Sequence, residues 1–344
     1  MKIGLVGYSG SGKSSLFTWM SGVEADPSAV HASQSAMATI PEPRLEALCK
    51  IYNPKKVTYA SMEIVDTPGL SRDHVGNVAK LAYLREADYL VCVVPAFSGA
   101  KVDGEMRSFV EDMILADLEI ATNRLQKIAE QLKKHLPKED LEKLRIENDT
   151  LELIRARLEA GNPLLADEMD DEQFHATRSF RFLTEKRRMI FVNTGDDETD
   201  FAQYSKFATE KEPVLAASVG LELELLKTDP EEAKAFCDEM GLTLVGRDKV
   251  VRAIMDNSGQ MVFLTAGEKE VRSWLTSKNG TALEAAGKIH SDFVKKFIRC
   301  EVIACDDLIR LGSEREVKAA GLNHRETKEY IVKEGDVLLF HIAQ

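Results

Sequence analysis

The stretch GYSGSGKS, residues 7–14, fits the pattern G-x-x-x-x-G-K-S. The apolar run KIGLV precedes it and the amphipathic segment SSLFTWMSG follows, so we expect a strand, a loop and a helix. In such a loop, backbone N–H groups and the helix N-terminus point at a bound phosphate. An ordinary glycine-rich turn is the alternative, which this context disfavours. The predicted nucleotide-binding residues of the loop are Gly7, Ser9, Gly10, Ser11, Gly12, Lys13, Ser14 and Ser15.

Two of these residues have a predicted chemical role beyond the backbone. Lys13 is expected to neutralise the β- and γ-phosphates as a catalytic point charge, and Ser14 is expected to give its hydroxyl to Mg²⁺. A second pattern, D-x-x-G, follows at Asp66-Thr-Pro-Gly69. Its carboxylate would hold Mg²⁺ through water, and the Gly69 amide would sense the γ-phosphate as a second catalytic group. Without the phosphate loop upstream, this sequence would only indicate a turn.

A third pattern indicates where the base lies. The apolar run MIFV ends in Asn193-Thr-Gly-Asp196, at the place of the Asn-Lys-x-Asp base-recognition motif of GTPases, but without its lysine. A polar turn after a strand is the alternative, since Asn, Gly and Asp are common turn residues. Ala216 and Ala217, at the end of the run 213–217, would offer small side chains against the base.

The arrangement of apolar runs predicts an α/β fold with a mainly parallel sheet of the P-loop GTPase type. Expected strands are Ser61–Asp66, Tyr89–Pro95, Met189–Asn193 and Pro213–Ala217. Between them, a heptad seam over 114–132 and a second one over 144–158, separated by His135-Leu136-Pro137, predict an antiparallel coiled-coil hairpin. We expect the seam only to pair the two helices.

The last eighty or so residues predict a separate α+β domain, most simply a β-grasp. Expected strands lie in MVFLT, EVRSWL, CEVIA, EYIV and DVLLFHI, around one helix at Thr281 to Phe297. The predicted domains are thus a nucleotide-binding domain of residues 1–104 and 184–260, a helical insertion of 105–183, and the β-grasp domain of 261–344.

Composition excludes several classes of protein. The 344 residues carry a net charge of −12, which argues against coating nucleic acid by bulk electrostatics, although a localised contact with RNA remains open. Neither a membrane-spanning segment nor a signal peptide is expected, and we predict a cytoplasmic protein without membrane partners. The five cysteines form no CxxC pair, so neither a disulfide framework nor a zinc site is expected.

The order of these motifs resembles the YchF, or Obg-like ATPase, family. The further stretches that carry the resemblance are VDGEMRSFVEDMILADLE (102–119), FLTAGEKEVRSW (263–274), AAGKIHSDFVKKFIRCEVIACDD (285–307) and EYIVKEGDVLLF (329–340). The resemblance covers essentially the whole chain. It implies a TRAFAC-class GTPase fold, a coiled-coil insertion, a C-terminal TGS-type domain, and an association with the ribosome and translation.

The sequence also departs from that family. Gly10 stands where members usually carry Asn, and the first switch is not clearly present, so that Ser28, Ser33 and Thr39 all remain candidates for its Mg²⁺ ligand. Leu70 occupies the place where Ras-like proteins keep a water-orienting glutamine, which predicts slow hydrolysis. His74 is a candidate substitute, or a solvated histidine without a role.

Three functions follow from these patterns. The leading one is Mg²⁺-dependent binding and slow hydrolysis of ATP or GTP, with the nucleotide state repositioning the helical arm or the TGS-like domain against a ribosome or RNA partner. The alternative is a nucleotide-gated scaffold with negligible turnover. A small-molecule kinase is disfavoured by the D-x-x-G spacing and the β-grasp tail. A basic helix end at Lys288, Lys295, Lys296 and Arg299 is either a ribosome-facing patch or a helix-dipole effect.

Overall fold

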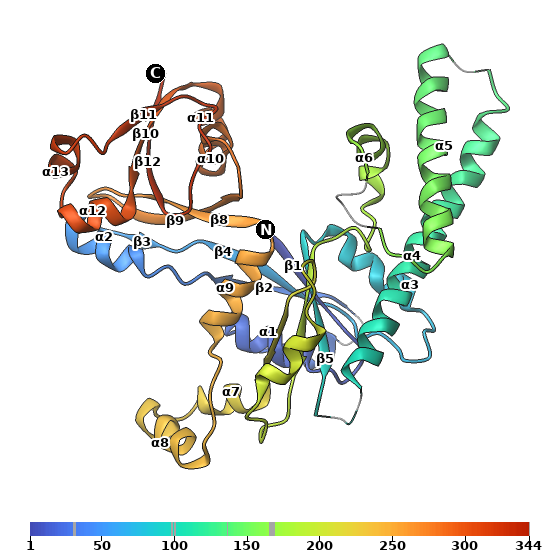
Figure 1. Ribbon diagram of the computed structural model, residues 1–344, viewed down its shortest axis with the longest axis horizontal. Helices are drawn as coiled ribbons and strands as arrows, with labels where there is room; N and C mark the ends of the chain where they lie inside the picture. The colour runs from blue at the N-terminus through green and yellow to red at the C-terminus, as the bar shows by residue number, and fades with distance from the viewer. Residues whose placement is uncertain (30–31, 98, 100, 136, 165–168, 344) are drawn as a thin grey trace. The chain divides into compact units, whose positions relative to one another are not determined.

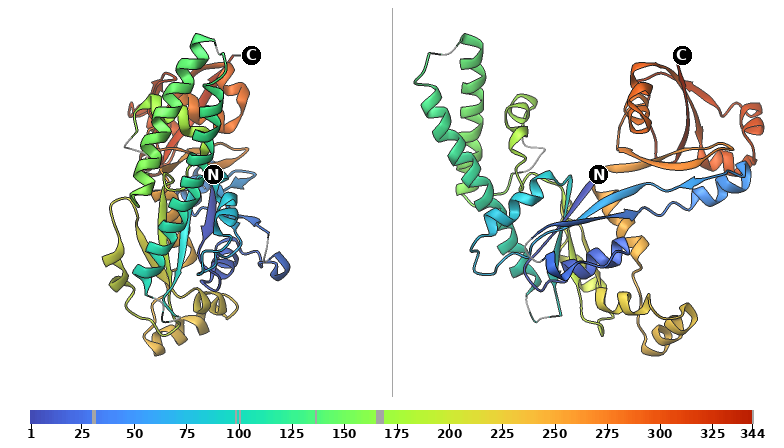
Figure 2. Two further views of the ribbon diagram at one scale, coloured as in Figure 1. Left: turned by 90° about the vertical axis from the view of Figure 1, so that its right-hand side faces the viewer. Right: turned by 180° about the vertical axis from the view of Figure 1, so that it is seen from behind.

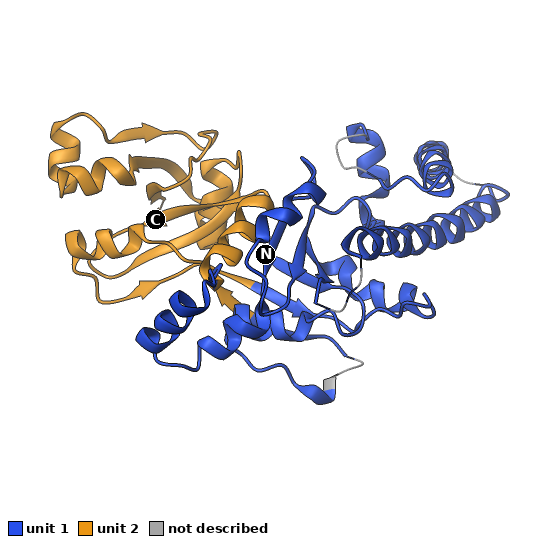
Figure 3. Cartoon of the chain, turned by 60° about the horizontal axis from the view of Figure 1, so that its bottom comes forward, with its two compact units in different colours: residues 1–36, 63–246 blue, residues 37–62, 247–344 orange. Residues whose placement is uncertain are grey.

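The computed structural model describes residues 1–29, 32–97, 99, 101–135, 137–164 and 169–343. The chain forms two compact units, which Figure 3 colours separately. Unit 1 consists of residues 1–36 and 63–246, and unit 2 of residues 37–62 and 247–344. The residue bounds of these two units differ from those of the three predicted domains. The boundaries of the three domains stay a prediction.

Unit 1 is organised around a six-stranded sheet with the order β2-β4-β1-β5-β6-β7 (Figure 1). Strands β4, β1, β5, β6 and β7 are parallel, and every residue of β5 and β6 is buried, as expected for strands covered on both faces. The predicted α/β class and the four predicted strands are confirmed. The bounds are β1 Lys2–Val6, β2 Gln34–Thr39, β4 Ser61–Asp66, β5 Tyr89–Pro95, β6 Arg188–Asn193 and β7 Val214–Ala217.

The parallel register brings the functional motifs to one edge of this sheet. Asp66 pairs with Leu5, and Asn193 pairs with both Pro95 and Ala217, so the carboxyl ends of the strands lie next to one another. Open parallel sheets bind ligands at this edge. The helices of unit 1 outside the arm are α1 Lys13–Ser21, α3 Asn77–Leu81, α7 Val219–Leu225 and α8 Pro230–Met240, with 3-10 helices η1 Pro27–Ala29, η2 Ala82–Glu86, η4 Arg178–Phe180 and η5 Phe201–Phe207.

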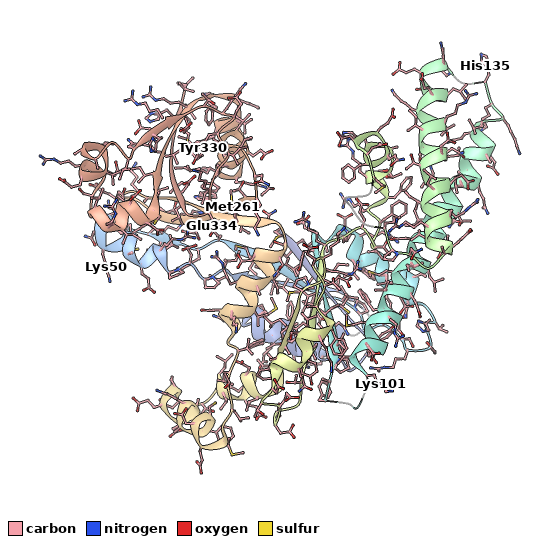
Figure 4. The ribbon with its side chains drawn as sticks, viewed as in Figure 1. Lys50, Lys101, His135, Met261, Tyr330 and Glu334 are labelled. Atoms are coloured by element: carbon pink, nitrogen blue, oxygen red, sulfur yellow. The ribbon has the colours of Figure 1, made fainter. Side chains whose placement is uncertain are left out.

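The predicted helical hairpin is present. Helix α4 (Val102–Gln131) and helix α5 (Lys138–Glu159) run side by side in both views of Figure 2 and are followed by α6 (Asp171–Thr177). Figure 4 labels Lys101 before α4 and His135 beyond its end; Leu136 of the predicted breaker lies outside the described residues. The buried seam consists of Ile114, Ala121, Leu125, Ile128, Leu144, Leu151, Ile154 and Leu158. Leu132 was predicted to extend it but is 37% exposed, because α4 has ended at Gln131.

Unit 2 contains a second six-stranded sheet, with the order β11-β10-β12-β8-β9-β3. Its strands are β3 Val57–Thr58, β8 Gln260–Thr265, β9 Val271–Ser277, β10 Phe297–Ala304, β11 His324–Glu326 and β12 Asp336–Ile342. Its helices are α2 Arg44–Tyr52, α9 Arg247–Asn257, α10 Ala282–Ile289, α11 Ser291–Lys295, α12 Cys305–Leu311 and α13 Glu314–Ala319. The early segment 37–62 belongs to this unit: Val57 pairs with Val271, and the Tyr52 hydroxyl donates to Glu314.

Two expectations for this C-terminal region were wrong. The helix predicted from Thr281 to Phe297 is two helices, because His290 adopts an extended conformation and its Nδ1 accepts a hydrogen bond from the Asp292 amide, capping the second helix. The segment EYIV is not a strand and makes only an isolated bridge at Ile331. Asp336 holds this segment in a turn by accepting hydrogen bonds from the Tyr330 hydroxyl and the Lys333 amide. Among the described residues, no helix is long and apolar enough to cross a membrane.

Candidate functional site

The loop between β1 and α1 wraps as the sequence predicted. Gly10 and Gly12 adopt positive φ angles of 81° and 92°, a conformation that favours glycine. A Cβ atom at Gly7 would lie 2.4 Å from the Val93 carbonyl oxygen. Glycine is therefore needed at Gly7 for close packing on the sheet and at Gly12 for the turn into α1.

Lys13 lies on the first residue of α1 and is 6% exposed. Its ammonium group donates to the carbonyl oxygens of Gly7 (3.0 Å) and Tyr8 (3.1 Å), which curl the loop around it. Burial lowers the pKa of this ammonium group to about 8. A buried cation without a full counter-charge is suited to an anionic ligand.

Ser14 and Asp66 are brought together as predicted. The Ser14 hydroxyl donates to Asp66 Oδ2 at 2.7 Å, and Gln34 Nε2 donates to the same oxygen at 3.2 Å. Asp66 is 5% exposed, and its other oxygen, Oδ1, is buried without a hydrogen-bond partner among the described residues. One hydroxyl and one carboxylate with an unused oxygen fit Mg²⁺, which keeps several waters and takes its other ligands from phosphates.

The D-x-x-G loop packs directly on the phosphate loop. The Ser9 amide donates to the Leu70 carbonyl (2.9 Å), and the Leu70 amide donates to the Gly7 carbonyl (3.0 Å). A Cβ atom at Gly69 would lie 3.0 Å from Ser9 Cα, so only glycine permits this approach. The Leu70 side chain is 1% exposed and belongs to the core of unit 1.

Asn193 ties the phosphate loop to the base motif. Its Nδ2 donates to the Ser11 carbonyl (3.2 Å), and its Oδ1 accepts from the Val219 amide (3.2 Å). A Cβ atom at Gly12 would lie 2.1 Å from Asn193 Nδ2. The side chain of Asn193 therefore links the phosphate loop to the start of α7 by hydrogen bonds. The spacing of the motifs in the sequence did not reveal this link.

The Asp196 carboxylate is held by the start of α7. Its Oδ1 accepts from the Ser218 hydroxyl (2.5 Å) and from the Leu221 amide (3.2 Å). A Cβ atom at Gly220 would lie 3.1 Å from the same oxygen. The carboxylate is thus oriented by its neighbours through Oδ1, and within the described part of the chain Oδ2 accepts no hydrogen bond.

One cavity of about 580 Å³ joins these motifs, a size typical of pockets for small ligands. Its lining residues are Gly10, Gly12, Lys13, Ser14, Ser15, Phe97, Asn193, Thr194, Gly195, Asp196 and Gly220. Seven predicted site residues are therefore brought together. Ser11, Ala216 and Ala217 are buried beside the cavity, and Gly7 and Ser9 belong to the adjoining loop.

The sequence reasoning missed Phe97, which lines the cavity and is 49% exposed. Its signal was positional, because it follows the carboxyl end of β5. For the first switch, Ser28 is exposed and donates to Asp26, and Ser33 is also exposed. Gln34, which was not a candidate, is the residue of this segment that contacts Asp66.

A buried carboxylate connects the phosphate loop to the helical arm. Asp112 of α4 is 2% exposed and accepts hydrogen bonds at 2.8 Å from the Tyr8 hydroxyl and from Asn77 Nδ2. His74 Nδ1 lies 2.8 Å from its other oxygen, and this hydrogen bond raises the pKa of His74. His74 is thus fixed rather than free on a solvated loop, although its side chain is 42% exposed.

Two family models and several known proteins match the chain. A family model described as a 50S ribosome-binding GTPase matches residues 2–139, and the YchF-GTPase_C model, described as a protein of unknown function, matches residues 261–343. The ribosome-binding ATPase YchF of Haemophilus ducreyi is 34% identical over 98% of both chains, and that of Bacillus subtilis is 30% identical over the same shares.

Obg-like ATPase 1 of Oryza sativa subsp. japonica is 29% identical, covering 99% of this chain and 91% of that protein. The solved structure of the Schizosaccharomyces pombe YchF GTPase covers 99% of this chain and 97% of its own, with a TM-score of 0.83 and 24% identity, which supports the fold. With a relative at 34% identity over nearly the full length of both proteins, the chain belongs to the YchF (Obg-like ATPase) family.

Proposed function

We propose that this protein binds a purine nucleoside triphosphate with Mg²⁺, hydrolyses it slowly, and uses the nucleotide state to control its contact with the ribosome in the cytoplasm. One observation carries the proposal: a single cavity connects the buried Lys13 with the oriented carboxylate of Asp196. One end suits polyphosphate and the other suits a base.

Each motif has a separate task in this proposal. Lys13 exchanges its two carbonyl partners for phosphate oxygens, and the backbone amides from Gly12 to Ser15, at the start of α1, face the β-phosphate. Ser14 and Asp66 would hold Mg²⁺, which supplies electrostatic stabilisation of the phosphate charge. The Gly69 amide would report the γ-phosphate, because Gly69 lies against Ser9 of the phosphate loop.

Slow turnover is supported by Leu70. Its side chain is buried in the core of unit 1 and has no polar atom with which to orient water. The alternative of a nucleotide-gated scaffold with negligible turnover rests on the same residue. Single-turnover phosphate release, with Mg²⁺ and with chelator, separates the two: Mg²⁺-dependent release supports the enzyme, whereas release no faster than in a protein-free sample supports the scaffold.

For the base, we propose that both ATP and GTP bind with weak discrimination, on the order of tenfold or less. The oriented Asp196 favours guanine, whose N1–H and exocyclic N2 amino group donate, at about 1.5–3 kcal/mol for a hydrogen bond to a charged group. The missing motif lysine and the family's ATPase members favour tolerance of adenine. Affinities of wild type and Asp196→Ala for both nucleotides test this: a hundredfold GTP preference that the variant loses would refute weak discrimination.

The ribosome is proposed as the partner because the bacterial relatives are ribosome-binding ATPases. The helical arm and the TGS-like domain, residues 105–183 and 261–344 as predicted, are the proposed contact regions. Asp112 gives the arm a physical link to the phosphate loop through Tyr8. Cosedimentation with ribosomes should differ between the ADP state and a non-hydrolysable triphosphate state, and Tyr8→Phe should reduce that difference; equal sedimentation in both states would contradict the switch.

A further inference from the structure

Three cations gather at the phosphate end of the site, and only Lys13 has a role so far. Each of them donates to a carbonyl oxygen of the phosphate loop or of the D-x-x-G loop, Lys13 to Gly7 and Tyr8, and Arg72 to Ser9. Lys80 Nζ donates to the Gly69 carbonyl oxygen at 2.8 Å, which helps to hold the D-x-x-G loop in place. Arg72 follows three residues after Gly69 and reaches the phosphate loop itself.

Arg72 is held at the place where the two loops touch. Its Nη1 donates to the Ser9 carbonyl (3.2 Å), its Nε donates to Glu105 (2.9 Å), and the guanidinium lies 5.5 Å from the centre of the Tyr8 ring. Glu105 comes from the first turn of α4 and its side chain is 11% exposed, so the anchor is well ordered by packing. Ser9, which accepts the hydrogen bond from Nη1, lies against Gly69. The guanidinium is therefore anchored beside the contact between the two loops, close to the Gly69 amide that is proposed to sense the γ-phosphate, although among the described residues Arg72 is not one of those that line the cavity.

The guanidinium also has donors to spare. An arginine carries five N–H donors, and within the described part of the chain Arg72 uses two of them, on Ser9 and Glu105. Its side chain is 51% exposed, so a ligand can reach the remaining donors. A planar guanidinium, which stays charged at all working pH values, matches the geometry of phosphate oxygens.

The chemistry of the reaction offers a role for such a group. In hydrolysis the water oxygen bonds to the γ-phosphorus while the bond to the β–γ bridging oxygen breaks, and the nucleoside diphosphate leaves with the electron pair. One proton of the water stays on the oxygen that has bonded to phosphorus, and the other passes to a second oxygen of the released phosphate. Charge on the transferring oxygens must be stabilised in the transition state, and a donated arginine is one way that P-loop NTPases do this. Leu70 contributes nothing polar here.

We propose that Arg72 is an arginine supplied by the chain to its own active site, which binds the γ-phosphate oxygens in the transition state, and that Glu105 positions it. This inference rests on the proposed function of the same site. The competing explanation is structural: Arg72 would only clamp the D-x-x-G loop to Tyr8 and α4. A clamp would affect nucleotide binding and stability, whereas a transition-state contact would affect turnover and leave ground-state binding in place.

The test uses the full chain with Mg²⁺, and compares wild type, Arg72→Ala, Arg72→Lys and Glu105→Gln. The matched control is Arg107→Ala, which removes an equal charge from α4 at a residue whose side chain is 74% exposed. Three quantities are measured for each variant: the single-turnover rate, the affinity for ADP, and the affinity for ADP with aluminium fluoride, which mimics the transferring phosphoryl group. Thermal unfolding shows whether each variant is folded.

Arg72→Ala should lower the turnover rate by at least about 10³-fold, and should lose most of the tightening that aluminium fluoride gives, while ADP affinity changes less than about threefold. Arg72→Lys should recover only part of the turnover rate, and the turnover rate of Glu105→Gln should lie between those of wild type and Arg72→Ala. Equal losses of ADP affinity and turnover, or a rate like that of Arg107→Ala, would overturn the proposal. If Arg72→Ala does not fold, Arg72→Lys decides by the same two affinities.

The outcome is distinguishable from failure of the proposed function. If the wild type binds nucleotide but does not hydrolyse it, the proposed hydrolytic function is refuted. The comparison of affinities with and without aluminium fluoride then still tests the role of Arg72. A wild type that shows no tightening with aluminium fluoride overturns the arginine proposal while leaving nucleotide binding intact.

Discussion

Substitution of Asp117 tests how the helical arm is joined to the nucleotide-binding sheet. Asp117 of α4 is fully buried, and its carboxylate accepts hydrogen bonds from Arg85 Nη1 (2.8 Å), the Leu183 amide (2.9 Å), and the Thr184 amide and hydroxyl (2.8 and 2.9 Å). Asp117→Ala takes the acceptor away from the Leu183 amide and from the amide and hydroxyl of Thr184. It also removes the counter-charge of Arg85, whose side chain is 14% exposed and keeps a hydrogen bond to the Arg181 carbonyl oxygen. Breaking a buried pair from one side costs about 3–5 kcal/mol, so we expect a loss of that size in the free energy of unfolding.

The assay is urea unfolding followed by tryptophan fluorescence. The chain has two tryptophans, and Trp19 is 1% exposed within unit 1, so a Trp274→Phe background isolates the unit that contains Asp117. Asp103→Ala is the control on the same helix. Its carboxylate is exposed and, among the residues that the structure describes, is paired with Arg107 alone, so we expect a change below about 1 kcal/mol. A loss below about 1 kcal/mol for Asp117→Ala, or one equal to that of the control, would show that the Asp117 carboxylate does not hold α4 to the segment before β6.

Three further predictions concern the site. Because the free Lys13 has a pKa of about 8 and bound phosphates favour its charged form, nucleotide affinity should fall roughly tenfold from pH 7 to pH 9, with proton uptake measurable by calorimetry in two buffers; a flat profile would count against it. His74 should titrate above its ordinary pKa by NMR, and Asp112→Asn should lower that pKa. The contribution of the His74–Asp112 pair to the free energy of unfolding is complete below about pH 6.5, the ordinary pKa of histidine. It disappears as the pH rises through the raised pKa of His74. Potassium should not accelerate hydrolysis relative to sodium, since Gly10 has no side-chain oxygen to bind it; a severalfold acceleration would show another ligand.

Local patterns predicted the parts of the fold that depend on local physics. Buried parallel strands are continuous apolar runs, so the strands β4, β5, β6 and β7 could be predicted. A phosphate loop has fixed glycine positions, so the motif residues Lys13, Ser14 and Asp66 could be assigned from the sequence. The hairpin seam was predicted for the same reason, because its period is set by the helix. The break at His290 was missed because the helical period continues across it, and a side-chain cap interrupts the backbone there.

What the sequence could not predict depends on tertiary contacts between distant segments. The addition of β3 to the C-terminal sheet pairs residues more than two hundred positions apart. The contact of Gln34 with Asp66 depends on β2 lying beside β4 in the sheet. The contacts of Ser218 with Asp196 and of Arg72 with Ser9 arise from loop conformations that have no sequence period. These contacts orient the motif residues. The sequence therefore revealed the motifs but not the contacts that hold their side chains in the site.

The most direct test of the whole account is calorimetry of the full chain with Mg²⁺ and ATP or GTP, comparing wild type, Lys13→Ala and Lys143→Ala. Lys143 is an exposed lysine of the helical arm, paired with Glu139, and provides an equal change of charge. We predict that wild type and Lys143→Ala bind both nucleotides, whereas Lys13→Ala shows no measurable binding and still unfolds cooperatively. Unchanged affinity in a folded Lys13→Ala variant would contradict the assignment of this cavity to nucleotide.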